Sequence, residues 1–185
     1  MKKSRQTSES ASTPKRDQFE AFYHDHYSAI SRYVARRVPV SSHDDVVAAT
    51  FVVAWRKFAT VTSPSLAWLY RIASFEVAHE RRRLGHQPRL TELDDLSLTD
   101  TVPLDDVFDV SVAFSQLSES DAELLRLVYW ENLSRNDIAE VLGTSVNAVN
   151  VRHFRALDRL SGAISRVNDV AGADQATNPI PKENP

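Results

Sequence analysis

The stretch from Ser134 to Leu160 constrains the fold of this chain more than any other feature. It opens with Ser-Arg-Asn-Asp, a serine three residues before an acid, which is a common start of a helix. Gly143 follows an apolar run at helical spacing and can end that helix in a left-handed conformation. Thr144 or Ser145 can then cap a second helix. Two helices joined by so tight a turn are typical of a helix-turn-helix.

The second helix of this motif has an apolar side and a polar side. Val149, Ala156 and Leu160 recur on the apolar side, at the spacing of a face that packs on a core. Asn147 and Arg155 lie largely on the opposite side. Asn and Arg are the side chains that form paired hydrogen bonds with the edges of adenine and guanine. The pattern therefore predicts a surface that reads nucleic acid.

The composition indicates a helical, globular chain. Its 185 residues are 42% hydrophobic and 25% charged, with only 4 Gly, and alternating β-branched residues are scarce. The absence of Cys excludes disulfides, Cys-bound zinc and a thiol nucleophile, and is typical of a reducing cytoplasm. No apolar run reaches the roughly 18 residues of a membrane span, and no signal-peptide core follows the polar N-terminus.

The formal net charge of −3 conceals two basic segments on either side of an acidic one. Residues 71–89 and 145–166 are rich in Arg, whereas residues 91–110 hold seven acids and no Lys or Arg. A phosphate backbone responds to such local patches rather than to the global sum. The charge pattern is therefore compatible with binding to nucleic acid.

Helical periodicity and its interruptions predict an all-α fold of two small helical domains joined by a flexible acidic linker. The first domain should hold a helix over 18–38, a second that opens at Ser41, Ser42 or His43 with Asp44 and Asp45 in its first turn, and a third from Leu66. The expected divisions are a disordered N-terminus at 1–17, the first domain at 18–84, the linker at 85–110, the helix-turn-helix domain at 111–163 and a disordered tail at 164–185.

Three parts of the chain resemble the extracytoplasmic-function sigma factors of bacterial RNA polymerase. The sequence "FEAFYHDHYSAISRYVARRV" at 19–38 is similar to the first helix of that family. The block "HDDVVAATFVVAWRKF" at 43–58, followed by "LAWLYRIA" at 66–73, resembles its most recognisable segment. The sequence "LSESDAELLRLVYWENLSRNDIAEVLGTSVNAVNVRHFRALDRL" at 117–160 resembles its fourth domain.

The resemblance implies a promoter-specificity subunit whose partners are the RNA polymerase core and promoter DNA. The core would be bound by the second helix, through Asp45, Val47, Phe51 and Trp55. The melted minus-ten element would be held by the third helix, through Tyr70, Arg71, Arg81, Arg82 and Arg83. The minus-thirty-five element would be read by Asn147, Asn150, Val151 and Arg155 at base edges, with Arg152 and Arg159 at phosphates. The acidic linker would thread through the core. Family members are often held inactive by an anti-sigma factor, so the resemblance allows for such a partner.

The chain departs from the family pattern at six positions. They are Ala48 and Ala49 in place of Gln-Glu, Ser74, Phe75 and His79 in place of Arg-Asn and a later Asp, and His153 in place of Leu. Polar contacts to the core are therefore missing at the two alanines, and the resemblance assigns no minus-ten contact to the three positions of the third helix. Phe154 is expected to take over part of the packing at His153.

Each candidate also has a purely structural interpretation. The Arg81–Arg83 run can be a solvated helix end that complements the helix dipole, and the polar recognition helix can be ordinary helix surface. Phe51 and Trp55 can be core residues. Trp68 is expected in the core. Tyr70 and the neighbouring arginine are expected on an exposed face, with the aromatic and basic groups that unpaired bases bind.

Two other function classes remain open. A stand-alone helix-turn-helix regulator would bind duplex DNA without polymerase and would not need the surface at 43–58. A helical enzyme is disfavoured, because the sequence shows no nucleophile and base, no phosphate-cradling Gly loop and no metal-ligand spacing. His24 and His26, two residues apart on a helix, point their rings apart. We expect no metal, no cofactor and no small-molecule substrate.

Overall fold

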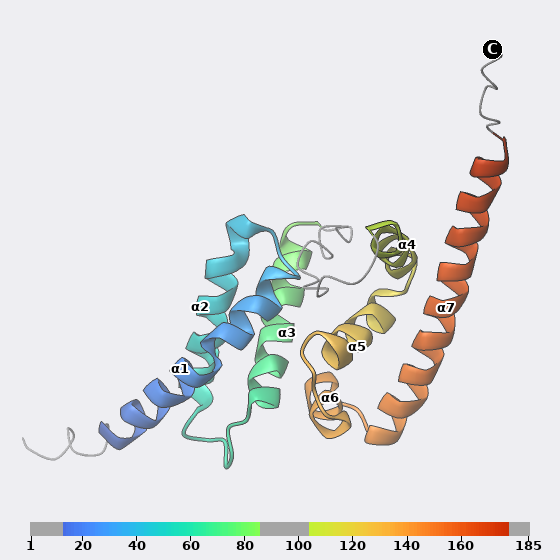
Figure 1. Ribbon diagram of the computed structural model, residues 1–185. Helices are drawn as coiled ribbons and strands as arrows, with labels where there is room; N and C mark the ends of the chain where they lie inside the picture. Colours follow the sequence, from blue (N-terminus) through green and yellow to red (C-terminus); the bar gives the residue numbers. More distant parts are fainter. Residues whose placement is uncertain (1–12, 86–103, 178–185) are drawn as a thin grey trace, which may run out of the picture. The chain divides into compact units, whose positions relative to one another are not determined.

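The computed structural model describes residues 13–85 and 104–177, and every regular element in these ranges is a helix. The helices are α1 (Thr13–Ala35), α2 (Val40–Lys57), α3 (Leu66–Arg83), α4 (Leu104–Ser115), α5 (Glu119–Tyr129), α6 (Arg135–Leu142) and α7 (Val146–Thr177) (Figure 1). They form two compact units, the first built on α1, α2 and α3 and the second on α4, α5, α7 and most of α6. The predicted all-α fold is confirmed.

The first unit packs three helices around one apolar core, and each helix contacts the other two. Ile30 and Val34 of α1, Ala54 of α2, and Leu69 and Ala73 of α3 are completely buried. The two residues from α1 are four positions apart, as are the two from α3, so each pair lies on one face of its helix. The helical periodicity of the sequence therefore produces the core that holds this unit together.

Helix α2 begins earlier than the sequence suggests. Its N-terminal boundary is Pro39, in an extended conformation (φ −60°, ψ 151°), and the Ser42 amide already bonds to the Pro39 carbonyl at 2.9 Å. We expected Asp44 and Asp45 in the first turn of this helix. Because α2 begins at Val40, they lie one turn further along instead. Proline fixes φ at a value that suits the residue before a helix, which explains the early start.

Helix α3 begins where the sequence predicts. The Trp68 amide donates to the Ser65 hydroxyl at 3.0 Å, which satisfies one of the free amides of the first turn. After Arg83 the chain turns at Gly85, whose φ of +66° is costly for residues with a Cβ atom. The expected start of this helix at Leu66 is confirmed.

The second unit surrounds a core formed by Phe114, Ala122, Leu125 and Ala156. Packed against it are the half-buried side chains of Leu117, Trp130, Leu157 and Leu160. Ser118 caps α5 by accepting a hydrogen bond from the Asp121 amide at 3.2 Å. The apolar side expected for the recognition helix is therefore the side that faces the core.

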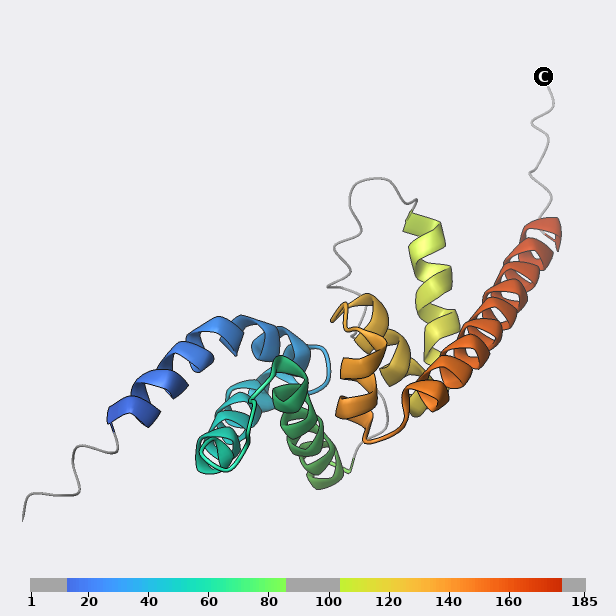
Figure 2. The same cartoon turned by 90° about the horizontal axis from the view of Figure 1, so that it is seen from below.

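The structure differs from the expected divisions at three boundaries. Helix α1 begins at Thr13, because Pro14 in a first turn breaks no helical hydrogen bond. Helix α4 begins at Leu104, inside the expected linker. Helix α7 continues to Thr177 and forms one unbroken rod (Figure 2). The rest of the expected termini and linker, 1–12, 86–103 and 178–185, lies outside the described residues.

The extension of α7 has a physical cause in the core. Ala163 is 1% exposed and lies seven residues after the buried Ala156, so the buried stripe of the helix continues beyond Gly162. A glycine inside a helix costs only about 1 kcal/mol relative to alanine, which such packing offsets. Among the described residues, no helix is both long enough and apolar enough to cross a membrane.

Candidate nucleic-acid interface

Helix α6 starts with the reciprocal cap that the sequence predicts. The Asp137 amide donates to the Ser134 hydroxyl at 3.2 Å, and the Ser134 amide donates to the Asp137 carboxylate at 3.3 Å. The serine hydroxyl also donates to that carboxylate at 2.6 Å. These bonds satisfy free amides at the helix start and fix where the motif begins.

The turn of the motif is closed by Gly143, whose φ is +63°. The Gly143 amide bonds to the Glu140 carbonyl at 3.2 Å, and the Thr144 amide bonds to the Ala139 carbonyl at 2.9 Å. This pair of bonds is a Schellman motif, which requires the left-handed residue that glycine supplies. Ser145, rather than the preceding threonine, then caps α7 by accepting from the Ala148 amide at 3.2 Å.

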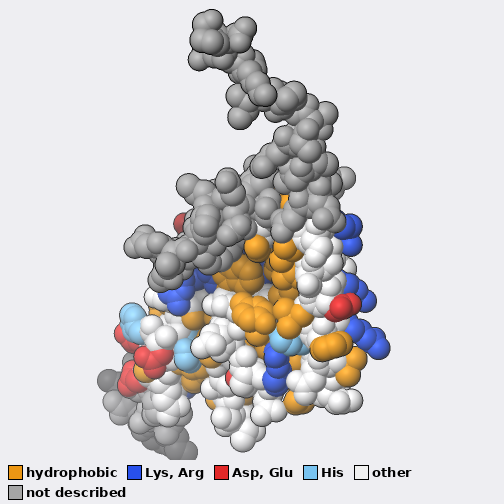
Figure 3. All heavy atoms as spheres, turned by 45° about the vertical axis from the view of Figure 1, so that its right-hand side comes forward, with side chains coloured by type: hydrophobic (Ala, Val, Ile, Leu, Met, Phe, Trp, Pro, Cys, Tyr) orange, Lys and Arg blue, Asp and Glu red, His pale blue; other side chains and the backbone are white. Residues whose placement is uncertain are grey.

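The outer side of α7 carries the predicted base-reading residues. Asn147, Asn150, Val151 and Arg155 are all exposed, whereas Val149 and Ala156 on the opposite side are completely buried. Figure 3 shows a face of the molecule on which Lys and Arg side chains lie beside hydrophobic ones. The first turns of α7 therefore present amide, guanidinium and apolar groups together, the combination that reads base edges in a major groove.

Phe154 belongs to this outer side and not to the core. Its side chain is 74% exposed, because it lies seven residues, or two turns, after Asn147. The expectation that it takes over the packing at His153 is therefore wrong. An exposed phenylalanine between Val151 and Arg155 adds an apolar contact to the candidate surface.

His153 fills its position in the second unit by itself. The Arg135 guanidinium of α6 donates to its Nδ1 at 3.0 Å, and the Tyr129 hydroxyl of α5 lies 3.4 Å from its Nε2. Burial, and then the nearby positive charge of Arg135, lower the pKa of His153. A polar ring thus joins α5, α6 and α7 at the position where the resemblance leads us to expect leucine.

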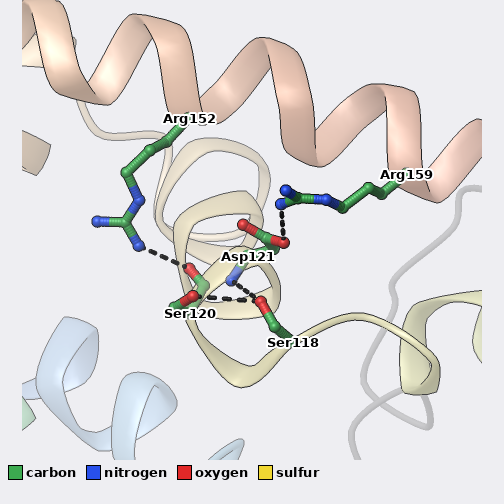
Figure 4. Close-up of polar contacts among 5 residues, drawn as sticks. All are labelled: Ser118, Ser120, Asp121, Arg152 and Arg159. Atoms are coloured by element: carbon green, nitrogen blue, oxygen red, sulfur yellow. Dashed lines mark hydrogen bonds and ion pairs between the residues drawn. The ribbon is translucent and has the colours of Figure 1, made fainter.

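The structure places Arg152 and Arg159 differently from the sequence prediction. Both reach back to the start of α5 rather than outward (Figure 4). Arg159 donates to the Asp121 carboxylate at 2.6 Å, and Arg152 donates to the Ser120 carbonyl at 3.4 Å. Asp121 is only 4% exposed. These arginines therefore tie α7 to α5, because their long side chains extend well away from the helix face that carries them.

The candidate core-binding residues of α2 divide into two groups. Asp45 is exposed and Trp55 is 38% exposed, the latter beneath the Lys15 ammonium at 4.6 Å from the ring centroid. Val47 and Phe51, in contrast, are only 4% and 6% exposed. The ring of Phe51 packs against Tyr23, with centroids 4.6 Å apart. Val47 and Phe51 are core residues in this structure, which favours their structural interpretation.

The candidate aromatic contact on α3 is also buried. Tyr70 is 2% exposed and packs against Tyr33 with ring centroids 5.1 Å apart, so the expectation of an exposed Tyr70 is wrong. Arg71 is half-buried. The exposed aromatic side chain of this helix is instead Phe75, at 62%. The exposure of Phe75 could have been predicted from the helical periodicity of the sequence, because Phe75 lies outside the buried stripe through Leu69 and Ala73.

The Arg81–Arg83 run is not uniform. Arg82 and Arg83 are exposed and Arg81 is half-buried. Arg83 donates two hydrogen bonds of 2.7 Å to the carboxylate of Glu80, which is 7% exposed. These bonds, and then one from Ser42 of α2, lower the pKa of Glu80 from 4.5 to about 2. Arg83 therefore has a structural partner and is a weaker candidate for DNA than Arg82.

The Glu80 pairing predicts an acid-sensitive first unit. A carboxylate whose pKa is lowered on folding stabilises the protein above pH 4.5, and this contribution disappears as the pH falls through about 2. Urea unfolding at pH 7 should therefore show Glu80→Gln to be less stable than the wild type. The difference should shrink as the pH is lowered from 5 towards 3. Glu76→Gln is the matched control, because it removes a carboxylate of the same helix that does not bond to Arg83. A difference independent of pH would contradict the prediction.

The sequence of this chain is similar to sequences of known proteins. Residues 108–160 match the family model "Sigma-70, region 4". The chain is 28% identical over 140 residues to the RNA polymerase sigma factor NccH of Alcaligenes xylosoxydans xylosoxydans, which covers 69% of this chain and 75% of that protein.

Two solved structures share the fold. The structure of CnrH in complex with the cytosolic domain of CnrY matches with a TM-score of 0.61 and 26% identity, covering 82% of this chain and 90% of that chain. The sigma factor RpoE from Bartonella quintana, in complex with the anti-sigma factor NepR, matches with a TM-score of 0.59 and 21% identity, covering 80% and 97%. Together with the capped helix-turn-helix, these likenesses show that residues 108–160 form a sigma-70 region 4 domain and that the chain is similar to RNA polymerase sigma factors over most of its length.

Proposed function

We propose that this chain binds the RNA polymerase core and directs initiation at specific promoters, with no chemistry of its own. The observation that carries the proposal is the doubly capped helix-turn-helix with its exposed amide and guanidinium face, in a chain that is similar to sigma factors. The second unit reads duplex DNA at the minus-thirty-five element, and the first unit binds the core and holds the melted minus-ten element. The polymerase supplies catalysis. Because this chain would act together with the polymerase, we also propose that it works in the cytoplasm.

The proposed minus-thirty-five surface consists of the exposed side chains at the start of α7. They are Asn147, Asn150, Val151, Phe154 and Arg155. The amides suit adenine, the guanidinium suits guanine, and the two apolar side chains suit the methyl group of thymine. Arg152 and Arg159 are not included, because they are engaged with α5.

The proposed core-binding surface is the exposed face of α2. It comprises Asp45, Ala48, Val52 and Trp55, which follow one another at intervals of three or four residues. Val52 is 47% exposed, and we assign to it the core-binding role that the sequence analysis gave to the buried Val47 and Phe51. CnrH and the Bartonella RpoE were each solved with a second protein, so we propose that an anti-sigma factor also regulates this chain.

The decisive test is promoter binding with and without core polymerase. A gel shift should show specific binding of a promoter fragment only when core is present, and in vitro transcription from a promoter library should then yield one enriched motif. Tight, specific binding by the isolated chain would favour the stand-alone regulator. Failure of the chain to associate with a cognate core polymerase would overturn the proposed function.

Phe154 gives a prediction about individual thymines. If its ring contacts a thymine methyl, Phe154→Ala should weaken holoenzyme binding to the selected promoter by roughly tenfold, within the ~1–3 kcal/mol of a base contact. Replacing the contacted thymine by deoxyuridine, which lacks that methyl, should weaken the wild type but not the variant further. Scanning each minus-thirty-five thymine in this way is the measurement. Equal sensitivity of both proteins to every deoxyuridine would contradict the contact.

A further inference from the structure

His153 lies where α5, α6 and α7 of the second unit meet, and polar groups of the other two helices face its ring. The Arg135 guanidinium donates to Nδ1 at 3.0 Å, and the Tyr129 hydroxyl lies 3.4 Å from Nε2. On α7 the histidine lies four residues after Val149 and three before Ala156, both completely buried, so it belongs to the side of the helix that packs on the core. These three polar groups, hereafter the His153 joint, connect the start of α6 to the early turns of the recognition helix.

The His153 joint requires a neutral imidazole with its proton on Nε2. An arginine side chain carries donors only, so Nδ1 must keep its lone pair to accept from Arg135. The proton of the neutral ring then lies on Nε2, which faces the Tyr129 hydroxyl, a group that can accept it. Protonation of Nδ1 would remove the acceptor and would leave two positive charges 3.0 Å apart.

Among the described residues, no carboxylate hydrogen-bonds to this imidazole. The group that faces it from α5 is the Tyr129 phenol, and the group from α6 is the Arg135 guanidinium. Of the nearby acids, Asp137 accepts from the serine that caps α6, Glu131 is in the turn between α5 and α6, and Asp158 is exposed on a different side of α7. Burial, and then the charge of Arg135, therefore lower the pKa of the histidine from its ordinary value of 6.5.

The His153 joint lies on the same turns of α7 as the proposed base-reading side chains. Asn150 is three residues before the histidine and Phe154 directly follows it, and both are exposed. Arg135 is the first residue of α6, next to the Ser134 cap. The joint therefore connects the two helices of the motif, and a shift at it would move the base-reading groups. Hydrogen bonds to base edges weaken steeply with such displacements.

We infer that His153 is a proton-sensitive positioning residue, which as a neutral ring holds α7 against Arg135 of α6 and when protonated releases Arg135 and loosens the base-reading surface. The inference rests on the proposed function, because the affected surface is the one proposed to read promoter DNA. The chemical step is the transfer of one proton from solvent to the Nδ1 lone pair. Because the joint lowers the pKa, its stabilising effect is complete above pH 6.5 and is lost as the pH falls through the lowered value.

The first test uses holoenzyme assembled with core polymerase and a promoter fragment that it selects, at about pH 7.5 and about pH 5.5. The wild type should bind roughly three- to tenfold more weakly at the lower pH. Glu80 keeps its charge at both values, because its pKa is about 2. His153→Asn places an amide oxygen near the position of Nδ1 and does not titrate, so it should stay within about twofold of the wild type at pH 7.5 and should lose little affinity in acid. Arg135→Met, with no guanidinium to release, should also lose little.

The matched control is His24→Gln, which removes an exposed histidine of the first unit. It should keep the acid loss of the wild type, because His24 is not part of the His153 joint. A second test needs no polymerase. In nuclear magnetic resonance of the full chain with nitrogen-15 histidine, the neutral His153 ring should carry its proton on Nε2, and its titration midpoint should rise in Arg135→Met.

The outcomes separate this inference from the proposed function. An equal acid loss in the wild type, His153→Asn and Arg135→Met would overturn the inference, as would a proton on Nδ1 of the neutral ring. Stronger promoter binding in acid that depends on His153 would place the imidazolium against a DNA phosphate and would also overturn it. Absence of core-dependent promoter binding at either pH would overturn the proposed function, while the resonance titration would still decide whether Arg135 controls the protonation of His153.

Discussion

Replacing Arg159 by Met should destabilise the second unit by about 2 kcal/mol, within the range for hydrogen bonds to charged groups. The guanidinium donates to Asp121 at 2.6 Å, and the Asp121 side chain is only 6% exposed. Removing its partner leaves a carboxylate that is shielded from water and uncompensated. The Arg159 side chain is 57% exposed, so the cost should stay below the 3–5 kcal/mol found for fully buried pairs. Urea unfolding followed by circular dichroism measures the effect.

A double-mutant cycle identifies the cause of that loss. If the ion pair is responsible, Arg159→Met in a background of Asp121→Asn should cost far less than it does in the wild type. The opposite outcome also has a clear meaning. Unchanged stability, together with weaker promoter binding and a salt dependence reduced by about one phosphate contact, would make Arg159 the backbone contact that the sequence suggested.

Replacing Arg155 by Ala should weaken binding of the holoenzyme to its promoter by ~1–3 kcal/mol and relax preference at one base position. The side chain is exposed on the same side of α7 as Asn147 and Val151. A guanidinium there can bond to two acceptors of one guanine, which no other base offers in the same arrangement. The measurement is competition binding against promoter fragments changed at each minus-thirty-five position.

The matched control for Arg155 is Arg166→Ala. Arg166 is also exposed on α7, but it lies eleven residues later, about 16 Å further along the helix axis. Its loss should leave base preference unchanged. Neither substitution should alter the unfolding midpoint. If Arg155→Ala weakens all sequences equally, the side chain binds phosphate rather than a base.

Local signals in the sequence predicted the elements that short-range chemistry determines. The Ser134 cap, the left-handed Gly143 and the start of α3 at Leu66 each depend on residues within a few positions, and all are found as expected. The exposed face of the recognition helix was also predictable, because the buried Val149 and Ala156 fix the helical phase.

Contacts between helices were harder to predict from the sequence. Tyr70 is buried because α1 places Tyr33 against it, and no spacing within α3 indicates that neighbour. Arg152 and Arg159 carry long flexible side chains, so helical phase does not determine where their guanidinium groups lie. Their acceptors are at the start of α5, more than thirty residues away in the chain. The hydrogen bond from Ser42 to Glu80 was unpredictable for the same reason, because the two residues are far apart in the chain and lie on different helices.

Because α7 is continuous, the proposed DNA-reading surface is rigidly connected to helical turns that lie far from it. The helix has 32 residues and is therefore about 48 Å long, while the residues proposed to meet bases occupy only its first ten positions. Its backbone hydrogen bonds run without a break from one end to the other, so a torque on the far turns would reach the groove-facing turns. A protein that gripped the distal end could thus change how the near end sits in DNA without covering any base-reading side chain.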